Sequence, residues 1–223
     1  QHLQLLPAQL PRHRRPSSSP RKLPNQPLLA LLGPVPLERA PAPLRPLGDD
    51  PEEVSKVVEK VVLERIPRRF GLDPENDIQI LAPMRKGPVG TDALNQAIQD
   101  ALWGNAEPLI QRGNRKPLYR HDKVIQTSNN YELDVRNGDI GTILRGGDKG
   151  EVFVSYATKD VSYDKESLEA LEPAYAISIH KSQGSQYPAV IIPIARSHQF
   201  MLGRNLLYTA ITRAKAHVVI VGG

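Results

Sequence analysis

Apolar residues recur at regular intervals from residue 50 onward, and their spacing predicts helices alternating with strands. Residues 50–66 repeat valine at helical intervals behind an Asp-Pro pair, which favours a helix start. Residues 77–83 (DIQILAP) form a short apolar run typical of a buried strand, and residues 91–103 return to helical spacing. Four residues share the apolar face of this second helix: Leu94, Ile98, Ala101 and Leu102. A strand, a loop and a helix in this order predict an α/β unit.

Residues 119–172 follow a different pattern, made of short runs rich in β-branched residues. These runs are KVIQT, DIGTILRG, EVFVSYA and VSYD. The pair Asn137-Gly138 is a hairpin signal, and RGGDKG is a second turn. Several short strands within about fifty residues predict a small β-barrel.

The α/β pattern returns after residue 172. Strands are expected over 174–180 and 189–195, a helix over 203–216 and a last strand over 217–223. The last strand is apolar and β-branched, which is typical of a central strand in a parallel sheet. The sequence therefore predicts an α/β layer, residues 49–118 and 173–223, into which a small barrel, residues 119–172, is inserted.

The first 48 residues carry neither pattern, and they hold 11 of the 21 prolines. Proline at this density removes backbone donors and fixes φ, so we expect a disordered, partly polyproline segment. It could serve as a basic anchor or a Pro-rich ligand, or simply as a solvated linker.

Composition limits the classes of function. The net charge is +5, but residues 1–48 alone contribute +6, so the charge of residues 49–223 gives no sign of a nucleic-acid partner. The chain has no cysteine, which excludes disulfides and thiolate sites, and its six histidines lack metal-ligand spacing. No apolar run is long enough to span a membrane, so a soluble, cytoplasmic protein is expected.

Three polar segments next to predicted strands are candidates for chemistry. HKSQGSQ, residues 180–186, separates two apolar runs, although a two-residue turn could join two strands. Its side chains are donors, and Gly184 lets the backbone approach a phosphate closely. Arg85 and Lys86 directly follow a strand, and Arg213 and Lys215 lie near the end of a predicted helix. Each segment also has a plain interpretation, respectively a polar turn, a solvated loop and charges that complement a helix dipole.

Taken together, these segments resemble a known family. HKSQGSQYPAVIIP followed by RNLLYTAITRAKAHVVIVG resembles the last two motifs of superfamily 1 helicases. IQILAPMRKGPVGTDALNQAIQ resembles the motif that opens their second RecA-like domain, and NNYELDVRNGDIGTIL resembles the inserted barrel of RecD-like DNA helicases, of the 5′→3′ branch. The resemblance implies a RecA-like parallel sheet, of the P-loop NTPase type, with an inserted barrel of the Src-homology-3 type.

The resemblance also implies roles for particular residues. Arg85 and Arg213 would meet the γ-phosphate of ATP bound with Mg²⁺, Arg213 as an arginine finger, and Gly184 and Gln186 would contribute to nucleotide binding. Tyr208, Thr209 and Thr212 would line or support the cleft and the path of the DNA strand. The residues implied to contact single-stranded DNA are His180, Lys181, Ser182, Gln183, Ser185, Thr209 and, on the barrel, Asn129, Asn130 and Tyr131.

Two departures from the family pattern stand out. Gln186 occupies a position where the family usually has Glu, and glutamine can still hydrogen-bond a ribose hydroxyl. No GxxxxGK[ST] motif occurs in the sequence, and the acidic Mg²⁺-binding motif of the first RecA-like domain is absent too. We therefore expect a C-terminal part of a helicase, inactive alone, with the N-terminal half as partner, and a truncated or frame-disrupted gene product would explain it. A non-catalytic module that binds single-stranded nucleic acid and an unrelated α/β enzyme are the alternatives.

Overall fold

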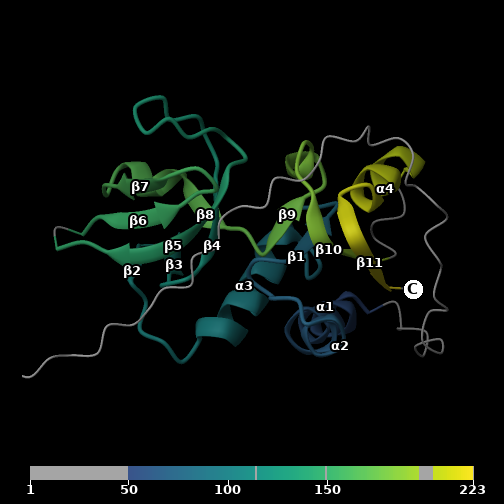
Figure 1. Ribbon diagram of the computed structural model, residues 1–223. Helices are drawn as coiled ribbons and strands as arrows, with labels where there is room; N and C mark the ends of the chain where they lie inside the picture. Colours follow the sequence, from purple (N-terminus) through teal and green to yellow (C-terminus); the bar gives the residue numbers. More distant parts are fainter. Residues whose placement is uncertain (1–49, 114, 149, 196–202, 223) are drawn as a thin grey trace, which may run out of the picture. The chain divides into compact units, whose positions relative to one another are not determined.

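A computed structural model describes residues 50–113, 115–148, 150–195 and 203–222. The described residues form a parallel sheet flanked by helices and a separate antiparallel sheet (Figure 1). This arrangement confirms the predicted α/β class and the small β structure inserted into it. The Pro-rich segment 1–48 lies outside the described residues. No described helix is long and apolar enough to cross a membrane.

The first helical region is continuous in sequence but changes its winding. It consists of α1 (Pro51–Lys60), a π-helical turn η1 (Val61–Arg65) and α2 (Ile66–Phe70). Asp50 caps the start by accepting a hydrogen bond from the backbone N–H of Glu52 at 3.0 Å. Gly71, with φ of 66°, ends the region in the left-handed conformation that favours glycine.

The parallel sheet has the strand order β11-β10-β1-β9. Its strands are β1 (Ile78–Ala82), β9 (Ala176–Ser178), β10 (Tyr187–Ile194) and β11 (Ala214–Gly222). Ala82 is paired with Ser178, and Tyr187 is paired with Ala214. The carboxyl ends of the strands therefore lie beyond Ala82 and Ser178, and the amino ends lie before Tyr187 and Ala214. These two sides of the sheet, where the strands end and begin, are called the carboxyl edge and the amino edge below.

The helix after β1, α3 (Thr91–Trp103), turns a partly polar face inward. Leu94 and Ile98 are buried as predicted, but Ala101 is exposed, so the predicted apolar face is wrong at that position. Asn95 and Gln99 are buried instead. Asn95 both donates to the carbonyl of Ala176 and accepts from its N–H, each at 2.8 Å, which fastens the helix to β9.

The C-terminal helix and strand differ from the prediction in length and place. Helix α4 (Arg204–Ile211) is shorter than predicted, and β11 begins already at Ala214. Lys215 therefore lies in a strand, and the helix-dipole explanation for it is wrong. The prediction of a central strand is also wrong, because β11 is at the edge of the described sheet, with Val218 and Ile220 39% and 50% exposed.

The antiparallel sheet, called the barrel below, has the strand order β7-β6-β5-β4-β8. Its strands are β4 (Lys123–Gln126), β5 (Ile140–Gly146), β6 (Val152–Ser155), β7 (Asp160–Tyr163) and β8 (Leu171–Pro173), with a 3₁₀ turn η2 (Ser167–Ala170) before β8. Strand β8 and the hairpin of β2 (Ile110–Arg112) and β3 (Arg115–Leu118) were not predicted. Asn137-Gly138 does form a turn, closed by the N–H of Asp139 and the carbonyl of Arg136 at 3.0 Å. That turn ends a long loop that connects the antiparallel strands β4 and β5, so the predicted hairpin exists, although its connection is much longer than two residues.

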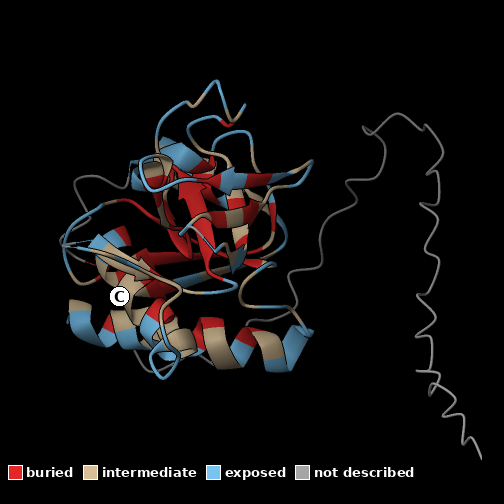
Figure 2. Cartoon of the chain, turned by 90° about the vertical axis from the view of Figure 1, so that its left-hand side faces the viewer, coloured by how far each residue is buried: buried red, intermediate tan, exposed pale blue. Residues whose placement is uncertain are grey.

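Three groups of buried apolar side chains stabilise these layers. One face of the parallel sheet packs against α1, η1 and α3, the other packs against α4 and two barrel residues, Ile125 and Ile140, and the barrel has a core of its own. The strands carry most of the buried positions (Figure 2). The domain boundaries at 118/119 and 172/173 remain a prediction.

Candidate functional site

The loop of residues 179–186, which contains HKSQGSQ, connects β9 to β10 across the height of the sheet. Strand β9 ends level with Ala82, whereas β10 begins two residues before Ala189, the partner of Ile78. The difference is six residues, or about 20 Å at about 3.3 Å per residue. A two-residue turn cannot cover this distance, because β9 and β10 are parallel. The loop therefore brings one end to the carboxyl edge and the other to the amino edge.

The first half of the loop is a 3₁₀ turn, η3 (His180–Ser182), at the carboxyl edge. His180 and Lys181 are exposed there. Ser182 is fully buried, and its hydroxyl donates to the carbonyl of Ile179 at 2.7 Å. The expected contact of Ser182 with DNA is therefore wrong, since its hydroxyl stabilises the turn.

The second half of the loop returns to the amino edge. Gly184 has φ of 87°, a conformation that side chains with Cβ rarely adopt, and Gln183 and Gln186 are exposed. Arg213 Nη1 donates to the carbonyl of Ser185 at 3.3 Å. The N–H of Tyr187 donates to the carbonyl of Arg213 at 2.8 Å. Gln186 thus lies beside Arg213.

Arg213 is held by the end of α4. Its Nε donates to the carbonyl of Thr209 at 3.3 Å, and its Nη2 donates to Thr212 Oγ1 at 3.2 Å. The hydroxyl of Thr209 donates to the carbonyl of Asn205 at 2.8 Å. Tyr208 is 70% exposed on the same helix. The guanidinium is only partly buried, so it remains open to a ligand at the amino edge.

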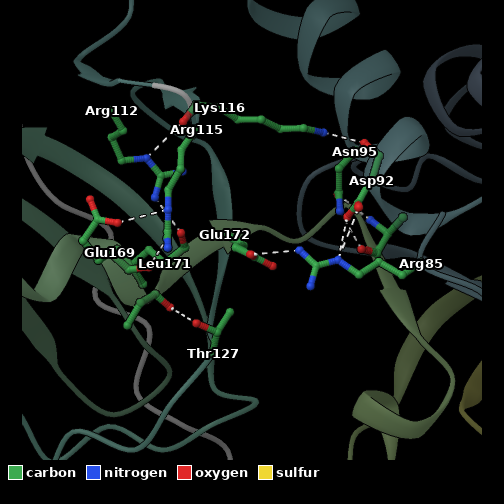
Figure 3. Close-up of polar contacts among 12 residues, drawn as sticks. Arg85, Asp92, Asn95, Arg112, Arg115, Lys116, Thr127, Glu169, Leu171 and Glu172 are labelled. Carbon is green, nitrogen blue, oxygen red and sulfur yellow. Dashed lines mark hydrogen bonds and ion pairs between the residues drawn. The ribbon is translucent and has the colours of Figure 1, made fainter.

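Arg85 lies at the opposite edge, three residues beyond the end of β1. Its guanidinium forms ion pairs with Asp92 at 3.2 Å and with Glu172 at 3.4 Å (Figure 3). The neighbouring carboxylate of Asp92, and then that of Glu172, raise the pKa of Arg85. Arg85 follows the carboxyl end of β1, whereas Arg213 precedes the amino end of β11. Contact of both arginines with one γ-phosphate stays a prediction, and the ion pairs of Arg85 favour a separate role for it.

Gly90 keeps the loop that carries Arg85 compact. A Cβ at residue 90 would lie 2.5 Å from the carbonyl oxygens of both Arg85 and Lys86. We expect Gly90→Ala to lower the free energy of unfolding by about 1–3 kcal/mol, because the backbone has to move to relieve this overlap. Urea denaturation would measure the change, with Gly203→Ala as control because, among the described residues other than its chain neighbour, no atom lies within 4 Å of a Cβ there. Equal stabilities of the two variants would contradict the expectation.

The barrel loop before β5 presents an exposed aromatic side chain. Tyr131 is 87% exposed. Asn130 Oδ1 accepts from the N–H of Leu133 at 3.0 Å, and Asn129 Oδ1 accepts from the N–H of Asn137 at 2.9 Å. Both amide oxygens therefore stabilise the loop, in which Tyr131 exposes its aromatic ring and Asn129 is exposed as well.

Comparison with known proteins matches both parts of the chain. Residues 173–221 match the UvrD-like helicase C-terminal domain, and residues 94–156 match the SH3 domain of ATP-dependent RecD-like DNA helicases. The ATP-dependent RecD2 DNA helicase of Deinococcus radiodurans is 37% identical over 140 residues, 62% of this chain and 19% of that protein. The RecBCD enzyme subunit RecD of Mycobacterium tuberculosis is 36% identical over 144 residues, 65% of this chain and 24% of that protein.

The chain belongs to the RecD-like helicases. It matches their C-terminal region, and it spans about a fifth to a quarter of the length of these relatives. Among solved structures, Bacteroides Pif1 bound to single-stranded DNA aligns with a TM-score of 0.49 and 17% identity, over 74% of this chain and 45% of that one. This likeness carries no argument about function.

A polar groove adjoins the amino edge of this RecD-like segment. Its volume is about 860 Å³, and residues of the barrel line it together with Ser185, Gln186 and Tyr187. Lys123 lines it as well, although this side chain is only 5% exposed. Lys123 Nζ donates to the carbonyl of Ile78 at 3.2 Å and lies 5.8 Å from the ring centroid of Tyr187.

Burial lowers the pKa of Lys123 to about 8, because the charged amine is removed from water. The carboxylates of Asp73, Asp77 and Glu75 oppose this shift only in part. Sequence reasoning missed Lys123, since a lysine at the start of a short strand gives no sign of burial. Its position in the sequence, near the boundary between the predicted α/β layer and the predicted barrel, is the signal that could have indicated burial of this lysine.

Proposed function

We propose that this segment forms the second RecA-like domain of an ATP-dependent helicase that moves along single-stranded DNA and unwinds duplex. The observation that carries the proposal is the loop 179–186, which reaches both edges of the sheet. Exposed donors of His180 and Lys181 stand at one edge, and Gln186 stands beside Arg213 at the other. One short segment can thus transmit a change at a nucleotide to a contact with DNA.

At the amino edge, Arg213 and Gln186 suit a nucleotide. A guanidinium binds phosphate oxygens, and an amide can hydrogen-bond a ribose hydroxyl. Arg213 would act as the arginine finger that stabilises the charge of the γ-phosphate during transfer. The described residues contain no cluster of three or more His, Cys, Asp or Glu able to hold a metal. In the proposal, Mg²⁺ and the phosphate-binding loop belong to the first RecA-like domain, the partner of this segment.

At the carboxyl edge, His180 and Lys181 suit the DNA backbone, and Gln183 follows them in the loop. Lysine and amide donors bind phosphates without reading sequence. On the barrel, Tyr131 suits a base, because an exposed aromatic ring can stack on any base. Arg85 belongs to this edge too, and we assign it to the loop before α3 rather than to the nucleotide.

We expect the purified chain to bind oligothymidylate, and Tyr131→Ala to weaken binding by about tenfold, since stacking contributes about 1–3 kcal/mol per base. Fluorescence anisotropy at fixed salt would measure the affinity. Tyr131→Phe retains the ring and should bind like the parent chain. Unchanged affinity in Tyr131→Ala would exclude stacking at the barrel loop, and no binding by the parent chain would contradict the proposed role in DNA binding.

A further inference from the structure

A buried carboxylate, Asp122, lies where the barrel joins the α/β layer. Its side chain is fully buried and accepts three hydrogen bonds. Gln99 Nε2 of α3 donates to Oδ2 at 2.6 Å, the N–H of Tyr119 donates to Oδ2 at 2.8 Å, and the hydroxyl of Tyr175 donates to Oδ1 at 2.8 Å. One carboxylate therefore connects the chain entering the barrel, the chain leaving it, and a helix of the α/β layer.

Further hydrogen bonds extend this connection. Trp103 Nε1, at the end of α3, donates to the hydroxyl of Tyr175 at 2.9 Å. Gln79 of β1 is fully buried and donates to the carbonyls of Ala174 and Tyr175, each at 3.0 Å. Both passages between barrel and sheet are thus tied to β1 and α3, in addition to the covalent chain.

The cost of burying Asp122 indicates that its place is specific. Removal from water raises the pKa of the carboxyl, and the hydrogen bonds from Tyr119, Tyr175 and Gln99 act against that rise. A buried charge of this kind is stabilising only while all its donors keep their geometry. Rotation of the barrel about its two connections would break several of these hydrogen bonds at once.

We propose that Asp122 is a positioning residue that holds the barrel in one orientation on the α/β layer, so that the Tyr131 loop and the His180–Lys181 turn engage the same DNA strand. A DNA strand that is long enough to reach two weak contacts on one rigid body binds far more tightly than it would bind to either contact alone. The proposal rests on the proposed function for its DNA part, whereas the rigid junction can be tested without DNA.

The first test measures the orientation of the barrel directly. Because the chain has no cysteine, spin labels can be attached through Lys56→Cys on α1 and Ser162→Cys on β7, both exposed positions. Asp122→Asn keeps the shape but removes the negative charge and turns one of the two acceptor oxygens into a donor, so at least one of the three donors loses its acceptor. Pulsed electron paramagnetic resonance measures the distribution of distances between the two spin labels. This distribution should be narrow for the parent and for the exposed control Asp148→Asn, and about twice as wide for Asp122→Asn. An unchanged width would overturn the proposal.

The second test separates positioning from stability. Affinity is measured for an oligothymidylate of about 5 nucleotides, which reaches one contact, and for one of about 25, which reaches both. Asp122→Asn should weaken binding of the long strand by about tenfold and leave the short strand within about twofold. Tyr175→Phe removes only one of the three hydrogen-bond donors to Asp122 and should therefore give a smaller loss of affinity for the long strand. Equal losses for both lengths would overturn the positioning role.

The outcomes also distinguish this proposal from the proposed function. If the parent chain binds neither oligonucleotide, the DNA-binding function fails, and the role of Asp122 in DNA binding fails with it, whatever the spin labels show. If the parent chain binds both lengths equally and Asp122→Asn changes neither, the function stands and the positioning role fails.

Discussion

Arg213→Ala should lower ATP turnover by about 1000-fold when the chain is joined to a P-loop domain, because an arginine finger contributes about 10³–10⁵ to the rate of phosphoryl transfer. Arg213 is held at the amino edge beside Gln186 by hydrogen bonds to Ser185, Thr209 and Thr212. The part of the ATP-dependent RecD2 DNA helicase of Deinococcus radiodurans that this chain does not match is a suitable partner to test. Phosphate release with and without single-stranded DNA would measure the effect.

Two other arginines serve as controls. Arg204 is exposed at the start of α4, and Arg204→Ala should leave turnover within about twofold. Arg85→Ala should also spare the chemical step, because Arg85 lies at the far edge of the sheet. A loss in Arg85→Ala as large as in Arg213→Ala would mean that the assignment of the two edges is wrong. The chain without a P-loop domain should show no ATP turnover. ATP turnover by this chain alone would mean that it holds a phosphate site of another kind.

The free energy of unfolding should rise by about 3 kcal/mol as the pH increases from about 8 to about 10.5, and Lys123→Met should remove this rise. The pKa of Lys123 is about 8 in the fold, below the ordinary value of 10.5. Within this range the unfolded chain binds more protons than the folded chain, so stability increases with pH. Below pH 8 the folded chain bears the full cost of a buried ammonium group.

At neutral pH, Lys123→Met should therefore stabilise the chain. The gain is about 2 kcal/mol, because removal of the buried charge is partly offset by loss of the hydrogen bond to the carbonyl of Ile78. Urea denaturation at several pH values would measure both effects. Burial also raises the pKa of Tyr175 and Tyr187, but this affects parent and variant alike. The exposed Lys165→Met is the matched control, and a parallel pH dependence in all three chains would exclude Lys123 as the cause.

Periodicity predicted those elements whose burial follows from their own sequence. Strand β1 and the valine-rich helix were found because one apolar face, or a whole apolar run, has to be covered. The face of α3 was misjudged because Asn95 and Gln99 are buried by partners distant in sequence, Ala176 and Asp122. The edge position of β11 was missed for a similar reason, since β-branched residues favour a strand without determining its neighbours.

The candidate site could be predicted as a set of residues but not as a geometry. The motif resemblance selected HKSQGSQ and Arg213, and the Ser185 end of that loop does contact Arg213. It also assigned Arg85 to the same phosphate, although Arg85 follows the carboxyl end of β1 and Arg213 precedes the amino end of β11, a separation that a linear sequence does not show. Burial of Ser182 was equally hidden, since serine suits both an exposed contact and an internal hydrogen bond.

The exposed edge strand β11 bears on how any experiment with this chain should be done. Strand β11, nine residues long, pairs with β10 on one side, and among the described residues no strand pairs with its other side. With Val218 and Ile220 exposed, that side is a template on which further strands can add. Lys215, exposed in the same strand, is the kind of charge that opposes such addition. Self-association at this edge would imitate a loss of activity or a change in affinity, so measurements should be repeated at several protein concentrations.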